Sequence, residues 1–596
     1  MNQYIKHKSQ FNAQPTIKVH GENYNVVKGW SNICKQLNTA ILELSPSRKV
    51  VVIETYQGII YEELVEQLKN GVDHKLFIES RDLMLSEEEI KIKTYPDVTD
   101  DRIFGYLTRL TLEDFFDPEK LRLAKQQIES ITEGVVVIFG TGASILWPKT
   151  SFQDSSILVY ADMARWEIQL RMRQHLVDNL GLSNRNTADW MLLYKQGYFV
   201  DWRICDRLKK QLFDQWDFLL DTNKANMPNL IEGKAALDAM EQAVARPFSV
   251  VPFFDPGPWG GQWMKEVCNL APSAPNYAWC FNCVPEENSL LLQFGDDIVE
   301  IPSINLVFRH PHALLGEPVH GRFGDEFPIR FDFLDTMEGG HLSLQVHPLT
   351  EYIQEKFGLH YTQDESYYLL DAKEDAVVYL GLKEGIDPDA MINELEMAQQ
   401  GVKSFDTEKH VQVWPVKKHD HMLIPAGTVH CSGKNSMVLE ISATPYIFTF
   451  KLWDWGRVGM DGKPRPINIE HGKKNIQWDR TTDWTRENLV NRIVKVAEGD
   501  GWTEERTGLH EREFIETRRH WFTKKVEMNT KGGVHVICLV EGDEIVVESP
   551  AGNFEPFVVH YAETFIVPAV VGQYTMRPHG TSAGKECATM LGYVRH

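Results

Sequence analysis

Side chains that could bind a metal ion together occur in three separate segments of the chain. In the first segment, residues 339–348, Gln345 and His347 alternate with apolar residues. Successive side chains of a strand point to opposite faces, so this alternation predicts a strand that directs Ser343, Gln345 and His347 to one polar face.

The other two segments each supply one further polar residue. Glu365 opens a predicted strand over residues 364–371, and His430 follows an apolar strand and a Pro/Gly turn within residues 423–430. Each of these side chains would stand at the mouth of a predicted strand. We therefore expect Glu365 and His430 to lie close to Gln345 and His347.

Together the four residues offer two imidazoles, one carboxylate and one amide oxygen. This mixed set suits Zn²⁺, with Fe²⁺, Mn²⁺ and Co²⁺ as plausible substitutes. A site with a single anionic ligand stays positively charged, so it could polarise a carbonyl group and stabilise an enediolate. Any one of these residues alone would be interpreted as an ordinary hydrogen-bonded side chain of a β-sandwich, but their order along the chain favours a metal site.

The first 245 residues predict an α/β domain. Short apolar runs at 49–54, 134–140 and 156–162 are typical of buried parallel strands. Helical patterns at 117–129 and 165–180 alternate with them. This layout resembles the P-loop class of small-molecule kinases.

The phosphate-binding signature of those kinases is missing from the chain. After the strand that ends at Ile53, the sequence reads Glu54-Thr-Tyr-Gln-Gly-Ile-Ile-Tyr61, which lacks the glycines and the lysine of a P-loop. Glu54 would also repel a phosphate. We therefore expect residues 1–245 to form a degenerate kinase-like domain with a structural or regulatory role and no phosphoryl transfer.

From residue 250 the pattern changes to short strands separated by Gly/Pro turns, which predicts jelly rolls. We expect a metal-binding domain over 246–495, with a helical insertion at about 388–401. A second β-barrel is expected over 496–596. Its segment Ile566-Val-Pro-Ala569 parallels Ile424-Pro-Ala-Gly427, but no histidine follows where His430 stands, so we expect this barrel to be free of metal.

Composition narrows the classes of partner. The chain has 596 residues and a formal net charge of −22, which argues against nucleic acid and anionic membrane surfaces as partners. The sequence begins without the apolar run of a signal peptide, and its most apolar internal stretch, residues 134–147, is too short to span a bilayer. We therefore expect a cytoplasmic protein in which any phosphorylated ligand binds to a local basic pocket.

The motifs around the four candidate ligands resemble the type I phosphomannose isomerases of the cupin superfamily. The resemblance extends from about Pro252 to the end of the chain. It is carried by the segments Gln345-Val-His-Pro348, Glu365 with the aromatic strand after it, Ile424-Pro-Ala-Gly-Thr-Val-His430, Trp259-Gly-Gly261, Pro285-Glu-Glu-Asn-Ser289, Phe323-Gly-Asp-Glu-Phe-Pro328, Trp453-Asp-Trp-Gly-Arg457 and Asp461-Gly-Lys-Pro-Arg465.

The resemblance implies a zinc ion held by Gln345, His347, Glu365 and His430. It also implies the interconversion of mannose 6-phosphate and fructose 6-phosphate through a cis-enediol. That reaction needs a proton-transferring group, charge stabilisation and a phosphate anchor. The resemblance points to Lys451, Glu440 and Arg457 as the catalytic residues. For substrate binding it points to Ser343, Lys463 and Arg457, with Arg465 behind them.

Two positions depart from the family pattern. The family commonly has a lysine two residues before the metal-binding glutamate, and Gln363 stands there. The family also has an arginine ten residues beyond the counterpart of Glu440. In this sequence that position is Phe450 if no residue is inserted, and Lys451 if one residue is inserted. Lysine is not equivalent to arginine at such a site.

Three functions follow from these observations. The first is a zinc-dependent isomerase acting on a phosphorylated hexose. The second is a metal-bound cupin that senses a sugar or sugar phosphate and uses the kinase-like domain as its output, which the two lost cations favour. The third, a bifunctional kinase and isomerase, is disfavoured by the absent P-loop. The retained basic residues favour the isomerase.

Overall fold

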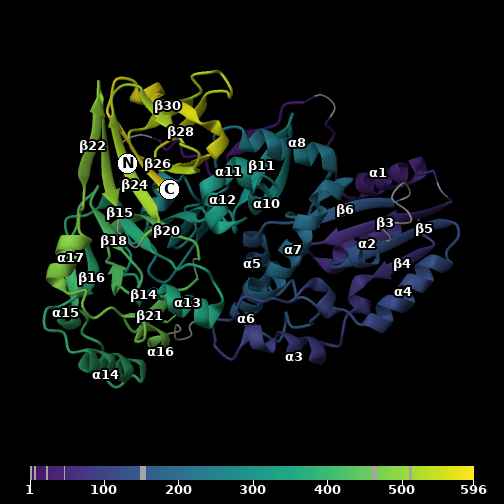
Figure 1. Ribbon diagram of the computed structural model, residues 1–596, viewed down its shortest axis with the longest axis horizontal. Helices are drawn as coiled ribbons and strands as arrows, with labels where there is room; N and C mark the ends of the chain where they lie inside the picture. Colours follow the sequence, from purple (N-terminus) through teal and green to yellow (C-terminus); the bar gives the residue numbers. More distant parts are fainter. Residues whose placement is uncertain are drawn as a thin grey trace. The chain divides into compact units, whose positions relative to one another are not determined.

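The structure is a computed structural model that describes residues 3–5, 8–21, 24–45, 47–147, 156–445, 447–458, 465, 467–508 and 513–596. The chain divides into two compact units. The α/β unit comprises residues 16–243 and 289–309. The barrel unit comprises residues 1–15, 244–288 and 310–596, and Figure 1 shows the elements of both units.

The α/β unit is built on a seven-stranded sheet in the order β2-β8-β7-β6-β3-β5-β4. Strands β4, β5, β3, β6 and β7 run parallel to one another, whereas β8 pairs antiparallel with β7; the three predicted apolar strands are confirmed as β3, β5 and β6. Valine and isoleucine side chains of β3 are fully buried, as expected for a strand covered on both faces. The strands are β2 (Val27–Lys28), β3 (Arg48–Thr55), β4 (Leu76–Glu79), β5 (Gly134–Gly140), β6 (Ser156–Asp162), β7 (Phe218–Asp221) and β8 (Asn229–Glu232).

Helices connect these strands. The predicted helix at 117–129 is α4, which begins after Asp117, whose carboxylate accepts the N–H groups of Glu119 and Lys120. The helix predicted at 165–180 ends at Arg173, because His175 adopts a left-handed backbone conformation (φ 57°). The helices are α1 (Trp30–Glu43), α2 (Tyr61–Gly71), α3 (Glu87–Val98), α4 (Pro118–Ser130), α5 (Arg165–Arg173), α6 (Trp190–Gln196), α7 (Trp202–Leu212) and α8 (Gly233–Val244).

The buried carboxylate of Glu54, near the end of β3, accepts hydrogen bonds from the segment that follows β5. It accepts the backbone N–H of Gly142 at 2.6 Å and that of Ser144 at 2.8 Å. Burial raises the pKa of Glu54 to about 7, although these hydrogen bonds favour its ionised form. The backbone donors at this edge of the sheet are thus bound by the protein's own carboxyl group.

Residues 289–309, which the sequence analysis assigned to the β region, group with the α/β unit. Strand β11 (Ser289–Phe294) pairs with β1 (Thr16–Lys18) and β12 (Asp297–Pro302), and α10 (Ile304–Arg309) follows. From α10, Asn305 contacts a buried ion pair: its amide oxygen lies 3.0 Å from Lys209 Nζ, and its amide nitrogen lies 2.8 Å from Asp162 Oδ2. Lys209 Nζ lies 2.8 Å from Asp162 Oδ1.

In the barrel unit, eight successive strands form jelly roll 1. One sheet contains the order β18-β15-β20-β13 and the other the order β17-β16-β19-β14. Consecutive strands therefore alternate between the two sheets, except for the hairpin of β16 and β17, as in a jelly roll. The strands are β13 (Ile329–Asp335), β14 (Leu344–Val346), β15 (Glu365–Ala372), β16 (Val377–Leu382), β17 (Val411–Pro415), β18 (His421–Ile424), β19 (His430–Ser432) and β20 (Ser436–Ala443).

Further elements extend jelly roll 1. The predicted helical insertion is α14 (Pro388–Gln399), which begins after the capping residue Asp387. The added strands are β9 (Phe253–Asp255), β10 (Trp279–Cys283) and β21 (Phe450–Trp453). The remaining helices of this region are α9 (Trp263–Val267), α11 (Pro311–Leu315), α12 (Glu317–Phe323), α13 (Thr350–Phe357), α15 (Thr407–His410), α16 (Ile469–Gly472) and α17 (Thr482–Asn488).

Jelly roll 2 repeats the same topology at the end of the chain. Its sheets contain the orders β29-β26-β31-β24 and β28-β27-β30-β25, so β24 to β31 correspond in sequence to β13 to β20. The strands are β24 (Ile515–Phe522), β25 (Val526–Asn529), β26 (His535–Glu541), β27 (Glu544–Glu548), β28 (Phe557–His560), β29 (Thr564–Val567), β30 (Gln573–Pro578) and β31 (Cys587–Val594).

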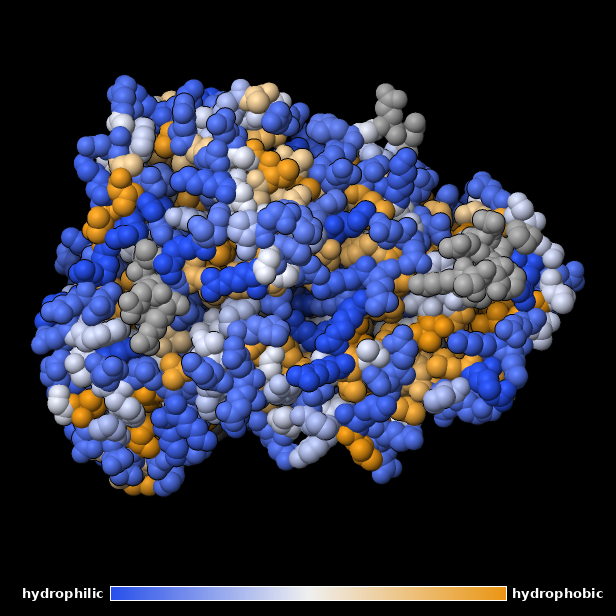
Figure 2. Space-filling model, in the orientation of Figure 1, coloured by the Kyte–Doolittle hydropathy of each residue, from blue (hydrophilic) through white to orange (hydrophobic). Residues whose placement is uncertain are grey.

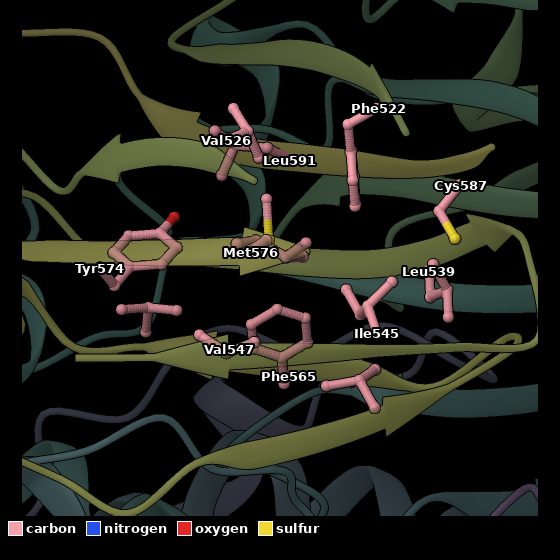
Figure 3. Close-up of a cluster of buried hydrophobic side chains, with 13 residues drawn as sticks. Phe522, Val526, Leu539, Ile545, Val547, Phe565, Tyr574, Met576, Cys587 and Leu591 are labelled. Atoms are coloured by element: carbon pink, nitrogen blue, oxygen red, sulfur yellow. The ribbon is translucent and has the colours of Figure 1, made fainter. Parts of the chain in front are cut away.

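An apolar core fills jelly roll 2. Figure 3 shows this core, in which Phe565, Met576 and Leu539 lie between the two sheets. Two strands, β22 (Val494–Gly499) and β23 (Trp502–Gly508), lengthen one of its sheets. These two strands are rich in charged residues, which hide the apolar and polar alternation of a strand in the sequence.

The face shown in Figure 2 is mainly hydrophilic, with hydrophobic side chains in small groups. Among the described residues, no helix has both the length and the apolar character needed to cross a bilayer.

Candidate metal centre

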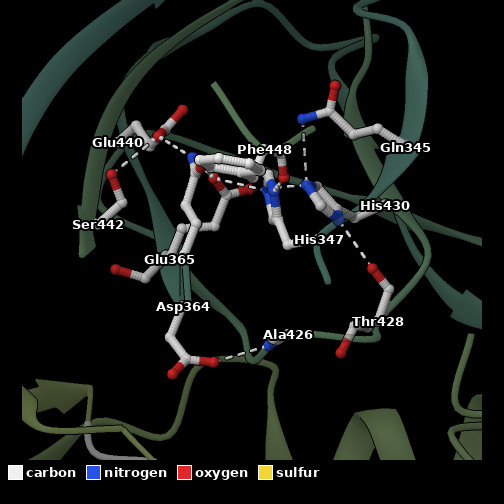
Figure 4. A network of polar contacts seen from close by, with 12 residues as sticks. Gln345, His347, Asp364, Glu365, Ala426, Thr428, His430, Glu440, Ser442 and Phe448 are labelled. Carbon is white, nitrogen blue, oxygen red and sulfur yellow. Dashed lines mark hydrogen bonds and ion pairs between the residues drawn. The ribbon is translucent and has the colours of Figure 1, made fainter. Parts of the chain in front are cut away.

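The three predicted segments converge inside jelly roll 1. Gln345 lies on β14 directly opposite His430, the first residue of β19, and His347 follows one pleat beyond Gln345. Glu365 is the first residue of β15. Figure 4 shows the four side chains directed toward one another, as the sequence analysis expected. His347, Glu365 and His430 offer ligand atoms that lie within 4.8 Å of one another.

The carboxylate of Glu365 lies between the two imidazoles. His347 Nε2 is 3.1 Å from Glu365 Oε2, and His430 Nε2 is 2.7 Å from Glu365 Oε1. The amide nitrogen of Gln345 is 3.3 Å from His430 Nε2. At most 7% of any of these side chains is exposed, so water cannot hydrate their charges.

Hydrogen bonds to the backbone fix which nitrogen of each imidazole faces the cluster. His347 Nδ1 is 3.0 Å from the carbonyl oxygen of Phe448, and His430 Nδ1 is 2.8 Å from that of Thr428. A carbonyl oxygen only accepts, so each Nδ1 carries a hydrogen. In the neutral imidazole the Nε2 lone pair then points at Glu365. Such an outer hydrogen bond is the usual support of a metal-binding histidine.

This arrangement fits a divalent cation. Two acceptor atoms as close as His430 Nε2 and Glu365 Oε1 require a proton or a cation between them. Burial alone would raise the pKa of Glu365, but the two neighbouring imidazoles lower it well below its ordinary value. A half-turn of the Gln345 amide would present its oxygen to the same centre. Two nitrogens and one or two oxygens suit Zn²⁺.

Glu440 belongs to a buried polar network beside the cluster. Its Oε1 accepts hydrogen bonds from Arg330 at 2.5 Å and from Ser442 at 3.0 Å. Burial and the charge of Glu365 raise its pKa well above the ordinary value. Gln363, which stands where the family has a lysine, has its amide nitrogen 3.3 Å from Glu365 Oε2 and 3.5 Å from Glu440 Oε1.

The strand register decides between Lys451 and Phe450. On β21, Lys451 lies opposite Gln345, and opposite residues of an antiparallel pair point to the same face. Lys451 is therefore the residue that shares the inner face with Gln345. Phe450 points the other way and stacks on the ring of His471, with 5.0 Å between the ring centroids.

The basic residues predicted for phosphate lie together. Asp454 binds Arg457, with 2.6 Å between Arg457 Nη2 and Oδ1, and Arg465, with 2.9 Å between Arg465 Nη1 and Oδ2. Burial lowers the pKa of Lys451, and the charges of both guanidinium groups lower it further. Ser343 is buried immediately before β14. The other predicted phosphate ligand, Lys463, lies outside the described residues.

Sequence reasoning missed two residues of the network, Arg330 and Asp454. Arg330 contacts Glu440 and also Asp332, with 2.8 Å between Arg330 Nε and Asp332 Oδ2. Both Arg330 and Asp332 stand in the buried strand β13 among apolar residues. Charged residues at alternate positions of an apolar strand were the signal that could have identified Arg330 and Asp332, because a buried charge needs a partner.

The jelly-roll fold and the buried His/Glu/His cluster define a β-barrel protein with a candidate metal site. Within that class of protein, part of this chain is homologous to mannose-6-phosphate isomerases of type I. The mannose-6-phosphate isomerase ManA of Bacillus subtilis is 27% identical over 232 residues, which are 39% of this chain and 67% of ManA. The probable mannose-6-phosphate isomerase GmuF of the same organism is 24% identical over 237 residues, or 39% of this chain and 69% of GmuF.

Two further comparisons concern the fold and the first part of the chain. The crystal structure of mannose 6-phosphate isomerase from Bacillus subtilis aligns with 59% of this chain and 100% of its own, at 19% identity and a TM-score of 0.47. Residues 29–245 match a family described as a domain of unknown function, DUF8485. A kinase-like origin of that domain stays a prediction.

Proposed function

We propose that this protein is a zinc-dependent aldose–ketose isomerase that interconverts mannose 6-phosphate and fructose 6-phosphate through a cis-enediol. The convergence of Gln345, His347, Glu365 and His430 carries the proposal, because both imidazoles direct Nε2 at the Glu365 carboxylate. When bound there, a divalent cation would polarise the substrate carbonyl and stabilise enediolate charge. The homology to mannose-6-phosphate isomerases supports this choice of substrate. A cytoplasmic location belongs to the same proposal.

The chain's own residues would supply proton transfer and phosphate binding. Lys451 lies opposite Gln345 and shares its face of the sheet, which supports a role for its amine in moving a proton between C1 and C2 of the sugar. Glu440, held by Arg330, would exchange a proton as the neutral acid. Arg457 and Arg465 would bind the phosphate, with guanidinium geometry suited to two oxygens at once. Ser343 and Lys463 are the further candidates for phosphate contact.

Proton exchange in D₂O tests the proposal directly. Protein loaded with Zn²⁺ is incubated with mannose 6-phosphate, and NMR follows deuterium at C2 and the appearance of fructose 6-phosphate. We expect both in the unmodified protein and neither in His347→Ala, together with loss of one bound Zn²⁺. No exchange by the metal-loaded protein would reject the isomerase.

A matched control comes from a second cluster of the barrel unit. The exposed residues His312 and Glu317 and the half-buried His320 also lie close enough to share a metal ion, with His312 Nδ1 2.9 Å from Glu317 Oε1. His312→Ala should leave exchange unchanged. If activity and zinc follow His312 and not His347, the assignment of the metal centre is wrong.

One observation favours the second function, a metal-bound sensor of a sugar or sugar phosphate with the N-terminal domain as output. Gln363 bridges Glu365 and Glu440 where the family has a cation. Gln363→Lys would place a cation between the two carboxylates. For an isomerase limited by this loss, exchange should rise by about tenfold or more. For a sensor, sugar phosphate should bind without exchange in both forms.

A further inference from the structure

Jelly roll 2 has an open cavity at the end that corresponds to the metal-binding end of jelly roll 1. Its volume is about 640 Å³, within the range of about 300 to 1,000 Å³ of small-molecule sites. His535 is the first residue of β26 and lies opposite Val567. In jelly roll 1, Glu365 is the first residue of β15 and lies opposite Ile424. His535 therefore occupies the position of Glu365.

The residue that contacts this position also differs between the two jelly rolls. His430, from the strand equivalent to β30, contacts Glu365 in jelly roll 1. In jelly roll 2 the β30 residue Tyr574 has its hydroxyl 2.8 Å from His535 Nδ1. Tyr574 is fully buried at one end of the apolar core (Figure 3) and also lines the cavity. The metal cluster is thus replaced by an imidazole and a phenol.

The cavity contains a buried polar atom that lacks a partner. His520, on β24, is 3% exposed and lines the cavity. Within the part of the chain that the structure describes, its Nδ1 is buried and has no hydrogen-bond partner. Burial lowers the pKa of His520 to about 4 and that of His535 to about 3, so both rings are neutral at physiological pH. A buried polar atom of this kind is costly unless a ligand satisfies it.

The charges around the cavity balance. Arg518 already binds two of the carboxylates, those of Glu516 and Glu504, the latter at 3.2 Å. The acidic and basic side chains of the lining are equal in number, so their charges sum to zero and do not favour an anion such as phosphate over a neutral ligand. The charged side chains of the lining are Glu504, Glu516, Glu527, Arg518, Lys531 and Arg595.

The walls combine aromatic surface with groups that donate and accept hydrogen bonds. Trp502 and Tyr593 are half-buried aromatic residues that pack on the core and line the cavity. A neutral imidazole has one donor and one acceptor nitrogen; His535 Nδ1 pairs with Tyr574, so His535 would meet a ligand hydroxyl through Nε2 and His520 would meet one through Nδ1. Aromatic rings cover the apolar C–H faces of a ligand, while their polar atoms stay available at the edge.

We propose that this cavity binds a neutral, polyhydroxylated small molecule, a mono- or disaccharide, at a site separate from the metal centre. His520, His535 and Tyr574 would hydrogen-bond its hydroxyl groups, and Trp502 would pack against one face. The inference goes beyond the proposed function, because it concerns binding in jelly roll 2 and no chemical step.

Isothermal titration calorimetry of the full chain tests the proposal. The probes are mannose, mannobiose, glucose and maltose, with inorganic phosphate and Zn²⁺ titrated separately. We expect saturable 1:1 binding of at least one of these sugars, and equal binding to the His347→Ala protein. His535→Leu and Trp502→Ala should each weaken it by about tenfold or more. Trp414→Ala, which removes a half-buried tryptophan of β17, should change nothing.

Because His535→Leu alters a buried position, its melting temperature is compared with that of the unmodified protein. Trp502 is half-buried, so Trp502→Ala keeps the test valid if His535→Leu does not fold. Three results would overturn the proposal: no binding of any sugar, binding of only phosphate or Zn²⁺, or sugar binding that is lost in His347→Ala and kept in both cavity variants. The outcome does not depend on isomerase activity.

Discussion

At the scale of single residues, Lys451 is the group that we propose for proton transfer. It is opposite Gln345 on the inner face of jelly roll 1. Burial lowers its pKa to about 7, and the charges of Arg465 and Arg457 act in the same direction. A general base works best when its pKa is near the working pH. The amine is uncharged, and able to accept a proton, above that pH.

Isomerisation should therefore increase with pH through about 7, the pKa of the Lys451 amine. Lys451→Met should reduce the rate by about 100-fold or more and remove this pH dependence, with one bound Zn²⁺ retained. Steady-state rates between pH 5.5 and pH 9, with zinc content measured in parallel, check both expectations. An unchanged pH profile in Lys451→Met would assign the titration to another group.

The sequence predicts those site residues that belong to the regular alternation of a strand. It does not predict residues that lie outside such a pattern. Gln345 and His347 follow the two-residue period of one strand, so their common face can be predicted. The choice between Phe450 and Lys451 could not be made, because counting along a loop does not reveal an inserted residue. Arg330 contacts Glu440 across 110 residues of sequence, and no local pattern links them.

At the scale of elements, the turn between β18 and β19 connects two residues of the candidate metal centre, His347 and His430. Gly427 in this turn has φ +87°, and its N–H donates to the carbonyl of His347 at 3.0 Å. A Cβ atom there would lie 2.7 Å from Gln477 Cγ and 2.9 Å from the Asn475 carbonyl oxygen. Only glycine adopts this conformation without strain in so little space.

Gly427→Ala should lower the free energy of unfolding by about 1 to 3 kcal/mol and weaken zinc binding, because His430 follows the same turn. Urea unfolding and a competition assay with a zinc chelator measure the two effects. Gly385→Ala is the control, since Gly385 has φ +71° but an added Cβ atom would meet nothing within 4 Å. Equal losses in both variants would show that only backbone strain matters.

The two jelly rolls are joined by an ionic contact. Glu541, at the end of β26, has Oε2 2.6 Å from Lys418 Nζ and 3.2 Å from His419 Nε2. The hydrogen bond from His419 and the charge of Lys418 lower the pKa of Glu541 from 4.5 to about 2. Its folded-state pKa is thus below the unfolded value, so the contact stabilises the protein above that value and is lost as pH falls toward 2.

Glu541→Gln should reduce the free energy of unfolding by less than about 1 kcal/mol at pH 7, because the carboxylate is partly exposed. The difference from the unmodified protein should shrink as pH falls from 4.5 to about 2, the ordinary and the lowered pKa of Glu541. Denaturant unfolding at several pH values gives this comparison, with Glu498→Gln on exposed β22 as control. A difference that does not vary with pH would mean that packing dominates.

At the scale of the whole molecule, the sequence predicts the local strand patterns well and the long-range pairing poorly. The parallel strands β3, β5 and β6 and the jelly-roll strands follow from their own composition. The pairing of β1 with β11 joins segments more than 270 residues apart, and neither strand shows a partner in its sequence. Such a pairing forms only in the complete fold. Strand β1 has three residues, which are too few to show in the sequence which strand it will pair with.

For the α/β unit we expect no hydrolysis of ATP or GTP and no phosphoryl transfer in the presence of Mg²⁺. The buried Glu54 carboxylate occupies the N–H groups of Gly142 and Ser144 that could otherwise meet an anion. Release of inorganic phosphate by the full chain is the measurement. Turnover that survives in the His347→Ala protein and disappears in Glu54→Ala would contradict this expectation.

The return of residues 289–309 to the α/β unit has a consequence for synthesis and for dissection of the chain. A ribosome that has reached residue 245 has not yet made β11, the partner of β1, or Asn305, which contacts the buried Lys209–Asp162 pair. The α/β unit can complete its folding only after residues 244–288 of the barrel unit and then residues 289–309 have been synthesised. A single cut by a protease therefore cannot release either unit whole.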